Sequence, residues 1–211
     1  MTKINISEGF NQGKDDILLP ILDKRWDALV IGSSTGGPKA LTSIISNLPD
    51  NKNSIPIFIV QHMPKGFTSS FAQRLDSICA LRVKEGQQGE LIRRGHIYIA
   101  PGDYHMILEG DHIVLDQRDK YLGVRPAVDY LFQTAAPKYK NNLLSIIFTG
   151  MGKDGTEGIR HIRNYGGTNI AQDRDSSVVF GMPGSAIESN NVDAVLSLDE
   201  ISKQLNILIK R

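Results

Sequence analysis

Cysteine, charge imbalance and long apolar runs are all scarce in this chain, and each scarcity excludes a class of protein. The single cysteine among 211 residues, Cys79, excludes an intrachain disulfide framework. No run of about 18 apolar residues occurs, so we expect no transmembrane helix. The first ten residues lack the apolar core of a signal peptide, and a net charge of +1 gives no strong field for nucleic acid. We therefore expect a soluble cytoplasmic protein with one substantial core, in which Cys79 is a buried structural thiol.

The stretch 28–40, ALVIGSSTGGPKA, is the most informative local pattern. Its apolar start predicts a buried strand, its glycine-rich centre a tight turn, and Pro38 the first turn of a helix. Such a turn serves either phosphate binding or the exposure of a serine nucleophile. Both phosphate motifs fail here, because Pro38 replaces the P-loop lysine and Ser34 replaces the second glycine of GxGxxG. A glycine-rich turn that only folds the chain is the remaining alternative.

Alternating strand and helix patterns continue along the chain and predict the fold class. We expect further strands at 55–60, 95–100, 143–148, 168–171 and 192–196. One helix is expected at 67–80, with Phe67, Phe71, Leu75 and Ile78 on one face, and another at 126–139. Three more are expected: one that ends at 164, one that begins at 186, and one that follows a cap at Ser197 or Asp199. A hairpin at 104–115 would make the sheet mixed. The sequence thus predicts a doubly wound α/β fold: a mostly parallel sheet, helices on both faces and an inserted β-hairpin.

Three of the expected strands end in residues with catalytic chemistry. Ser34 lies in the first glycine turn, His62 directly follows the second strand, and Asp154 lies in a second glycine turn after strand 143–148. The carboxyl ends of parallel strands meet at one edge of a sheet. A serine nucleophile needs a base, and the base needs an acceptor that fixes its tautomer. These residues therefore form a candidate Ser–His–Asp triad.

Other interpretations of the same residues stay open at this point. Ser34 and Asp154 are also suited to capping the helices that follow them, and His62 to binding a loop carbonyl. Ser33 competes as the nucleophile, and the orienting acid has three competitors, Asp103, Asp129 and Asp173. The remaining histidines show no metal-ligand spacing and are expected to be structural or exposed: His96, His105, His112 and His161.

Long motifs then give the chain a family resemblance. The strings are IGSSTGGPKAL, IVQHMPKGFTSSFAQRL, IYIAPGDYHM, RPAVDYLF, FTGMGKDGTEGI and AQDRDSSVVFGMPGSAI. From about Trp26 to the C-terminal helix, the chain resembles the catalytic domain of the chemotaxis-response protein-glutamate methylesterases of the CheB type. The resemblance implies Ser34 as nucleophile, His62 as base and Asp154 as acid. It implies the Met151 backbone N–H as an oxyanion donor, and Thr35, Met182 and Arg125 as residues that line or support the pocket.

The resemblance also implies an activity and its partners. The reaction is hydrolysis of the γ-methyl ester of glutamyl residues in the cytoplasmic helices of chemoreceptors, with release of methanol. Family members also deamidate glutamine at such sites. No metal or organic cofactor is implied, nor any nucleic acid or membrane insertion. The expected partner is the cytoplasmic domain of methyl-accepting chemoreceptors, in chemotactic adaptation through two-component signal transduction.

The chain departs from the familiar arrangement at its start. Such methylesterases usually carry an N-terminal receiver domain, but only 25 residues precede Trp26, against about 100 for a typical domain. We expect an N-terminal extension at 1–24 and a catalytic domain at 25–211, with control by a separate regulatory protein. A hydrolase of another ester or amide, or a non-catalytic receptor-binding module, is the alternative.

Overall fold

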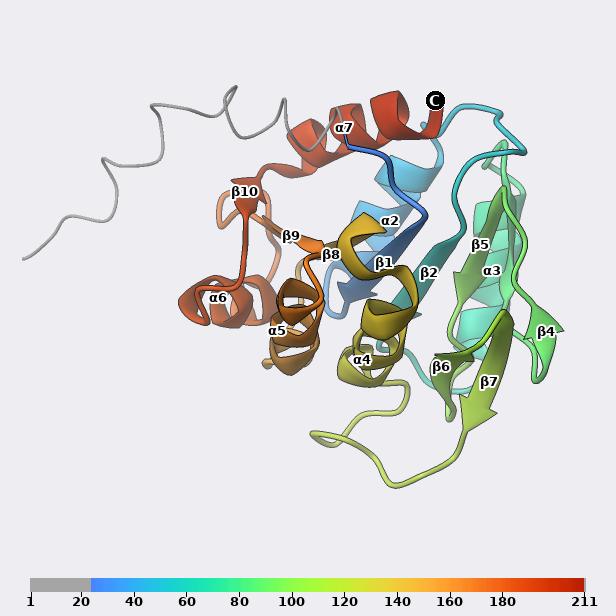
Figure 1. Cartoon of the computed structure of the whole chain (residues 1–211), viewed down its shortest axis with the longest axis horizontal. Helices are drawn as coiled ribbons and strands as arrows, with labels where there is room; N and C mark the ends of the chain where they lie inside the picture. The colour runs from blue at the N-terminus through green and yellow to red at the C-terminus, as the bar shows by residue number, and fades with distance from the viewer. Residues whose placement is uncertain (1–23, 211) are drawn as a thin grey trace, which may run out of the picture.

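A computed structural model describes residues 24–210 as a parallel sheet covered by helices (Figure 1). Seven strands lie in the order β10-β9-β8-β1-β2-β5-β3, and all neighbouring strands are parallel. Their bounds are β1 Ala28–Ser33, β2 Ile57–Gln61, β3 Arg82–Glu85, β5 His96–Ile99, β8 Leu143–Ile147, β9 Thr168–Gln172 and β10 Ala194–Leu196. The chain builds outward from β1 to one side and then returns to build from β8 to the other. The gap between the loops after β1 and β8 is thus a topological switch point, where open α/β sheets bind ligands.

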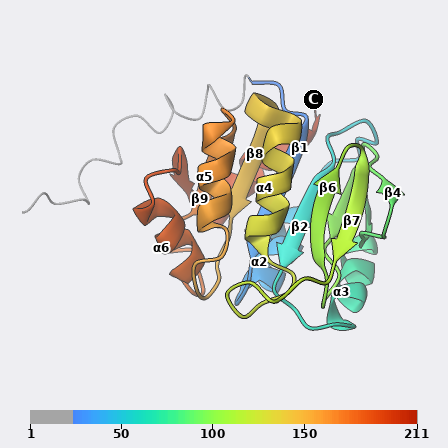
Figure 2. The same ribbon diagram turned by 60° about the horizontal axis from the view of Figure 1, so that its bottom comes forward.

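Helices cover both faces of this sheet (Figures 1 and 2). One face carries α4, α5 and α6, and the other carries α2, α3 and α7. Their bounds are α2 Gly37–Ile45, α3 Phe67–Asp76, α4 Val128–Tyr139, α5 Thr156–Asn164, α6 Gly181–Glu188 and α7 Leu198–Lys210, with a 3₁₀ turn η1 at Lys140–Asn142. The prediction of a doubly wound α/β fold is confirmed.

Strand β1 shows why the central strands read as unbroken apolar runs. Leu29 and Ile31 pack in the core under α2, α3 and α7, whereas Ala28 and Val30 pack in the core under α4, α5 and α6. All four side chains are buried. A strand covered on both faces has no polar side to alternate with. Each fully buried leucine or isoleucine contributes about 1.5–3 kcal/mol, so these strands form the stable base on which the loops are mounted.

The hairpin forms as expected, but it lies in a different sheet. Strands β6 (His105–Glu109) and β7 (His112–Asp116) join β4 (Glu90–Leu91) in a separate three-stranded antiparallel sheet. The prediction that the hairpin makes the main sheet mixed is therefore wrong. The position beside β5 is taken by β3, whose charged sequence RVKE gave no strand signal. The hairpin packs its apolar face against α4 instead.

Three predicted helix details also need correction. Helix α3 ends at Asp76 instead of residue 80, because the Asp76 carboxylate accepts the Val83 N–H at 2.7 Å as the chain turns into β3. Ile78 therefore lies beyond the helix and is 41% exposed, and Phe67, the first residue of α3, is 66% exposed. Cys79 lies in this turn and is only half-buried. Helix α6 begins at Gly181, ahead of the predicted start at 186.

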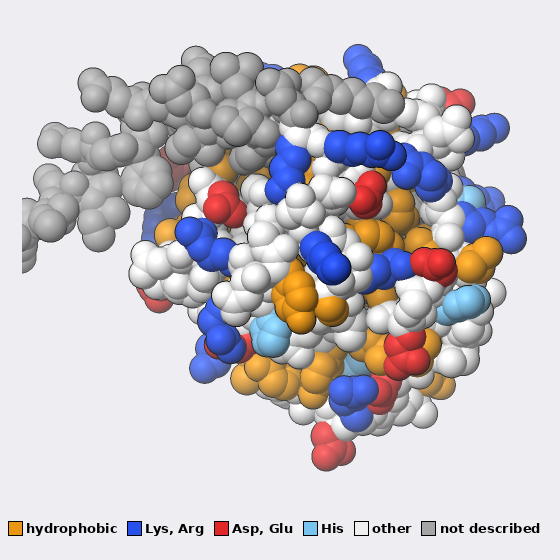
Figure 3. Space-filling view, viewed as in Figure 1, with side chains coloured by type: hydrophobic (Ala, Val, Ile, Leu, Met, Phe, Trp, Pro, Cys, Tyr) orange, Lys and Arg blue, Asp and Glu red, His pale blue; other side chains and the backbone are white. Residues whose placement is uncertain are grey.

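The predicted N-terminal extension lies, except for its last residue, outside the described residues 24–210. Within that range, no helix has the length and apolar character needed to cross a membrane. Basic and acidic side chains are interspersed on the face shown in Figure 3, as the net charge of +1 suggests.

Candidate active site

The register of the sheet brings the candidate triad residues to one edge. Ser33 pairs with Gln61, so Ser34 and His62 leave their strands side by side. On the other side of β1, Gly32 pairs with Ile147, and the loop that carries Asp154 leaves β8 at the same level. All three loops therefore open at the carboxyl edge of the sheet, around the switch point.

His62 and Asp154 form the central pair of this edge. The His62 Nε2 atom lies 2.7 Å from Asp154 Oδ2, and both side chains are largely buried. The same carboxylate accepts the backbone N–H of Val128 at 2.7 Å and of Asp129 at 3.0 Å. These are free N–H groups of the first turn of α4, where a helix favours negative charge. Asp154 does not cap the helix that it precedes, since Gly155 is the N-cap of α5.

Ser34 lies beside this pair, half-buried, between β1 and α2. Its N–H donates to the carbonyl of Thr149 at 3.1 Å, which fixes it against the loop after β8. It does not cap α2, whose N-cap is Gly36 with no side-chain hydrogen bond. Within residues 24–210, its hydroxyl makes no hydrogen bond with His62. Since Nε2 of His62 is taken by Asp154, Nδ1 is the ring nitrogen left for a hydroxyl.

The competing residues have other partners. The Ser33 hydroxyl is fully buried and donates to Gln61 Oε1 at 2.7 Å, so it faces away from solvent. Asp103 accepts two hydrogen bonds from Arg125, and Asp173 accepts from Ser176. Neither of these carboxylates contacts His62 through a hydrogen bond in the part of the chain that the structure describes.

Asp129 is the competitor that does belong to the site, although not as the partner of His62. It is buried on α4, and its Oδ1 accepts the Gly158 N–H of α5 at 2.6 Å. Asp154, just before α5, binds the first turn of α4 in return. Asp129 of α4 thus binds an N–H at the start of α5, and Asp154, in the loop before α5, binds two at the start of α4. We call this arrangement the exchange of caps. Burial, and then the nearby Asp154, raise the pKa of Asp129 to about 7.

The remaining predicted pocket residues divide into an open and a supporting group. Met151 lies in the loop after β8 with its side chain 75% exposed, and its N–H has no hydrogen-bond acceptor among residues 24–210. Thr35 is exposed beside Ser34. Met182 is fully buried behind Gly150. Arg125 binds Asp103 and the carbonyls of residues 117 and 118, and so holds the loop before α4.

Polar side chains at the ends of buried strands form a framework that the sequence interpretation missed. Gln61 Nε2 donates to the Ser34 carbonyl at 3.0 Å. Thr149 Oγ1 donates to the Thr35 carbonyl and accepts the Val179 N–H, both at 2.9 Å. Gln172 Oε1 accepts the Thr149 N–H at 2.8 Å. All three are buried. The signal available in the sequence was a polar residue closing each apolar run, at the level of the candidate triad.

The other histidines lie apart from this framework. His105 is buried; its Nδ1 accepts the Ala127 N–H at 3.1 Å, and burial lowers its pKa. His96 and His161 are half-buried and His112 is exposed. Among the described residues, no group of histidine, cysteine and carboxylate side chains is arranged to hold a metal ion.

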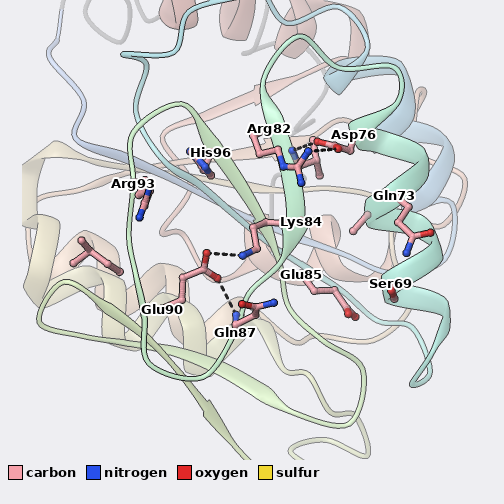
Figure 4. A pocket seen from close by; sticks show the side chains of 13 residues that line it. Ser69, Gln73, Asp76, Arg82, Lys84, Glu85, Gln87, Glu90, Arg93 and His96 are labelled. Carbon is pink, nitrogen blue, oxygen red and sulfur yellow. Dashed lines mark hydrogen bonds and ion pairs between the residues drawn. The ribbon is translucent and has the colours of Figure 1, made fainter.

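One cavity of the described chain lies away from these residues. It measures about 590 Å³ and opens between α3, β3 and β4 (Figure 4). Its lining holds three basic side chains (Arg82, Lys84 and Arg93) and three acidic ones (Asp76, Glu85 and Glu90). Two ion pairs form among them, Arg82 with Asp76 at 2.9 Å and Lys84 with Glu90 at 2.6 Å. Asp76 also blocks the open edge of β3 by binding the Val83 N–H. This cavity therefore offers a ligand no excess of charge of one sign.

Comparisons with known proteins agree with the motifs and the fold. A family model described as CheB methylesterase matches residues 29–205. The protein-glutamate methylesterase/protein-glutamine glutaminase of Thermotoga maritima is 50% identical over 185 residues, which are 86% of this chain and 54% of that protein. The protein of the same name from Clostridium acetobutylicum is 43% identical, over 87% of this chain and 53% of its own length. This chain therefore spans about half the length of the curated relatives it matches.

A solved structure gives the same result at the level of the fold. The crystal structure of the Thermotoga maritima CheB methylesterase catalytic domain matches with a TM-score of 0.83 and 48% identity. The match covers 88% of this chain and 100% of that one.

Proposed function

The chain belongs to the CheB methylesterase family, and from that premise we propose that it is a serine hydrolase that removes the γ-methyl ester from glutamyl residues of chemoreceptors. The observation that carries the proposal is the 2.7 Å His62–Asp154 pair beside Ser34, at three adjacent strand ends. Ser34 is the nucleophile, His62 the base and Asp154 the orienting acid. Deamidation of glutamine, with ammonia in place of methanol, is the second reaction of the same site.

Asp154 fixes which nitrogen of His62 does the chemistry. By accepting from Nε2, the carboxylate keeps the proton there and leaves Nδ1 as the basic nitrogen. The two N–H groups of α4 hold the carboxylate in turn, so the acid cannot rotate away from the ring. The Ser34 hydroxyl reaches Nδ1 when substrate is bound, because catalytic hydrogen bonds often tighten only in the complex.

The reaction proceeds in two halves. Ser34 Oγ attacks the ester carbonyl and Nδ1 of His62 takes the hydroxyl proton, which gives a tetrahedral oxyanion. The unbonded N–H of Met151 donates to that oxyanion, an interaction worth about 3–4 kcal/mol in comparable sites. His62 then gives the proton to departing methanol. Water, activated by the same nitrogen, hydrolyses the acyl-enzyme, which releases the γ-carboxylate of the glutamyl residue and regenerates the Ser34 hydroxyl.

The biological setting is part of the proposal. The partner is the cytoplasmic domain of methyl-accepting chemoreceptors, and the protein acts in the cytoplasm during chemotactic adaptation. Residues 25–211 form the catalytic domain and residues 1–24 an extension.

The test is methanol release from a methylated chemoreceptor cytoplasmic fragment. We expect release by the wild-type protein, loss of at least about 10³-fold in Ser34→Ala, and near-normal release in Ser33→Ala. Ser33 provides the matched control because it is the neighbouring serine in the chain, but its hydroxyl is buried and donates to Gln61. Equal activity of Ser34→Ala and the wild type would remove Ser34 from its role. Activity on a small ester without activity on the receptor fragment would assign the chain to another substrate.

A further inference from the structure

A second cavity adjoins His62 on the side away from Ser34. It measures about 400 Å³ and is walled by the loops after β2 and β5 and by the loop before α4. Ser34 follows β1, and β2 lies between β1 and β5 in the sheet. A protein substrate lying across this edge with its ester at Ser34 therefore passes over the cavity.

The walls of this cavity carry an excess of positive charge. Lys65, Lys120 and Arg125 line it, against the single carboxylate Asp103. Arg125 binds Asp103 at 2.6 Å and holds its pKa, with help from Lys65 and Lys120, below the usual range. Within residues 24–210, neither Lys65 nor Lys120 forms a hydrogen bond or an ion pair. With His62 neutral, two positive charges remain unpaired around the cavity.

We infer that this cavity is a subsite for a carboxylate of the substrate protein, carried by a glutamate or aspartate one helical turn from the ester. The inference rests on the proposed function, in which the ester lies in a helix. Side chains three or four residues apart on a helix are about 5–6 Å from each other at Cβ. His62 follows the strand next to that of Ser34, and neighbouring strands lie about 4.7–4.9 Å apart, so one helical turn leads from the ester toward the His62 wall of the cavity. Lys65 and Lys120 are the specificity-determining residues.

The arrangement contrasts with the larger cavity at β3. There three basic side chains face three acidic ones, so the charges of the lining balance. Figure 4 shows one of the ion pairs, between Lys84 and Glu90. Beside His62, the only carboxylate of the lining is already held by Arg125, so an incoming carboxylate finds two ammonium groups without competitors.

The experiment compares two chemoreceptor cytoplasmic fragments that each carry one γ-methyl ester. One has glutamate, and the other alanine, which the proposed deamidation cannot convert into glutamate, at the positions three and four residues from the ester. Methanol release gives kcat/KM for both. We expect the wild type to favour the glutamate fragment about fivefold at low salt, and the preference to shrink at 0.5 M salt because exposed charges are then screened.

Charge variants assign the preference to the subsite. In Lys65→Glu/Lys120→Glu the ratio of the two kcat/KM values should fall below one, and in Lys65→Gln/Lys120→Gln it should approach one. Lys203→Glu, an exposed change on α7 away from the cavity, should keep the wild-type ratio. An unaltered ratio in the double variants, or equal rates for both fragments in the wild type, would overturn the subsite alone. Absence of methanol release from both fragments would overturn the proposed function and the subsite with it.

Discussion

Replacing Gly150 by alanine tests how closely the loop after β8 must approach Ser34, the proposed nucleophile. Gly150 has no positive φ, so alanine fits its backbone and the substitution probes space alone. A Cβ there would lie 2.8 Å from the Cβ of Ser34 and still closer to Sδ of Met182. Met182 is fully buried and has little room to swing aside. The clash therefore falls on the nucleophile and on the residue behind it.

The backbone of Gly150 is fixed on both sides. Its N–H donates to Val179 at 2.9 Å, and its carbonyl accepts from Met182 at 2.8 Å. Retreat of the loop would break these bonds, so we expect Ser34 to move instead. The added Cβ and the Cβ of Ser34 would be about 0.6 Å closer than the 3.4 Å at which ordinary van der Waals contact begins. Since a displacement of about 1 Å can cost 10²-fold in rate, we expect a loss of about 10–100-fold in kcat.

The assay is methanol release by Gly150→Ala, with Gly152→Ala as the control. Gly152 lies in the same loop, has a φ of 89°, and has open space around its Cβ position. Alanine there carries a backbone cost of about 1 kcal/mol without a clash, so stability should drop slightly and kcat should change little. Wild-type kcat in Gly150→Ala, or an equal loss in both variants, would refute the argument that Gly150 makes room for Ser34.

Three further changes test the site. Asp154→Asn should lower kcat about 10⁴-fold, measured by methanol release. By removing the charge at the first turn of α4, it should also destabilise the fold by about 1 kcal/mol, measured by urea unfolding. Full activity would exclude a catalytic role for the His62–Asp154 pair. Thr149→Val removes two hydrogen bonds of a buried hydroxyl and should cost about 2–3 kcal/mol in urea unfolding, with an unchanged midpoint counting against the framework. For Asp129, the pKa is raised from 3.8 to about 7, so its contribution to stability is present at acid pH and lost as pH rises toward 7. The wild type should therefore lose on the order of 1–3 kcal/mol relative to Asp129→Asn between pH 4.5 and 7.5, and parallel unfolding curves at the two pH values would contradict this.

The parts of the fold that the sequence predicted well are those whose signal is local. Strands β1, β2 and β8 are buried on both faces and therefore appear in the sequence as apolar runs. The end of each run also marks which residues lie at the carboxyl edge of the sheet. Strand β3 was missed because an edge strand with the sequence RVKE carries charge where a central strand carries valine or isoleucine. The hairpin was expected in the main sheet, but β3 takes the position beside β5 and the hairpin lies in a second sheet.

The candidate site shows a similar division. The position of Ser34, His62 and Asp154 at one edge follows from strand periodicity and topology. The exchange of caps between Asp129 and Asp154 does not, because it depends on two helices meeting across 25 residues of chain. Gln61, Thr149 and Gln172 were passed over for a related reason. A polar residue at a strand end gives no sign of which neighbouring loop it binds until the strand order is known.

The exchange of caps between α4 and α5 also gives the active site a readout that needs no substrate. The amides of Val128, Asp129 and Gly158 lie in the first turns of the two helices, where such groups have no partner within the helix. Here they are bonded to carboxylates, so their hydrogens exchange with solvent slowly and are released together when the two helices part. Deuterium uptake at Val128 and Asp129 thus measures how often Asp154, the proposed acid, leaves its place, and uptake at Gly158 measures the same for Asp129.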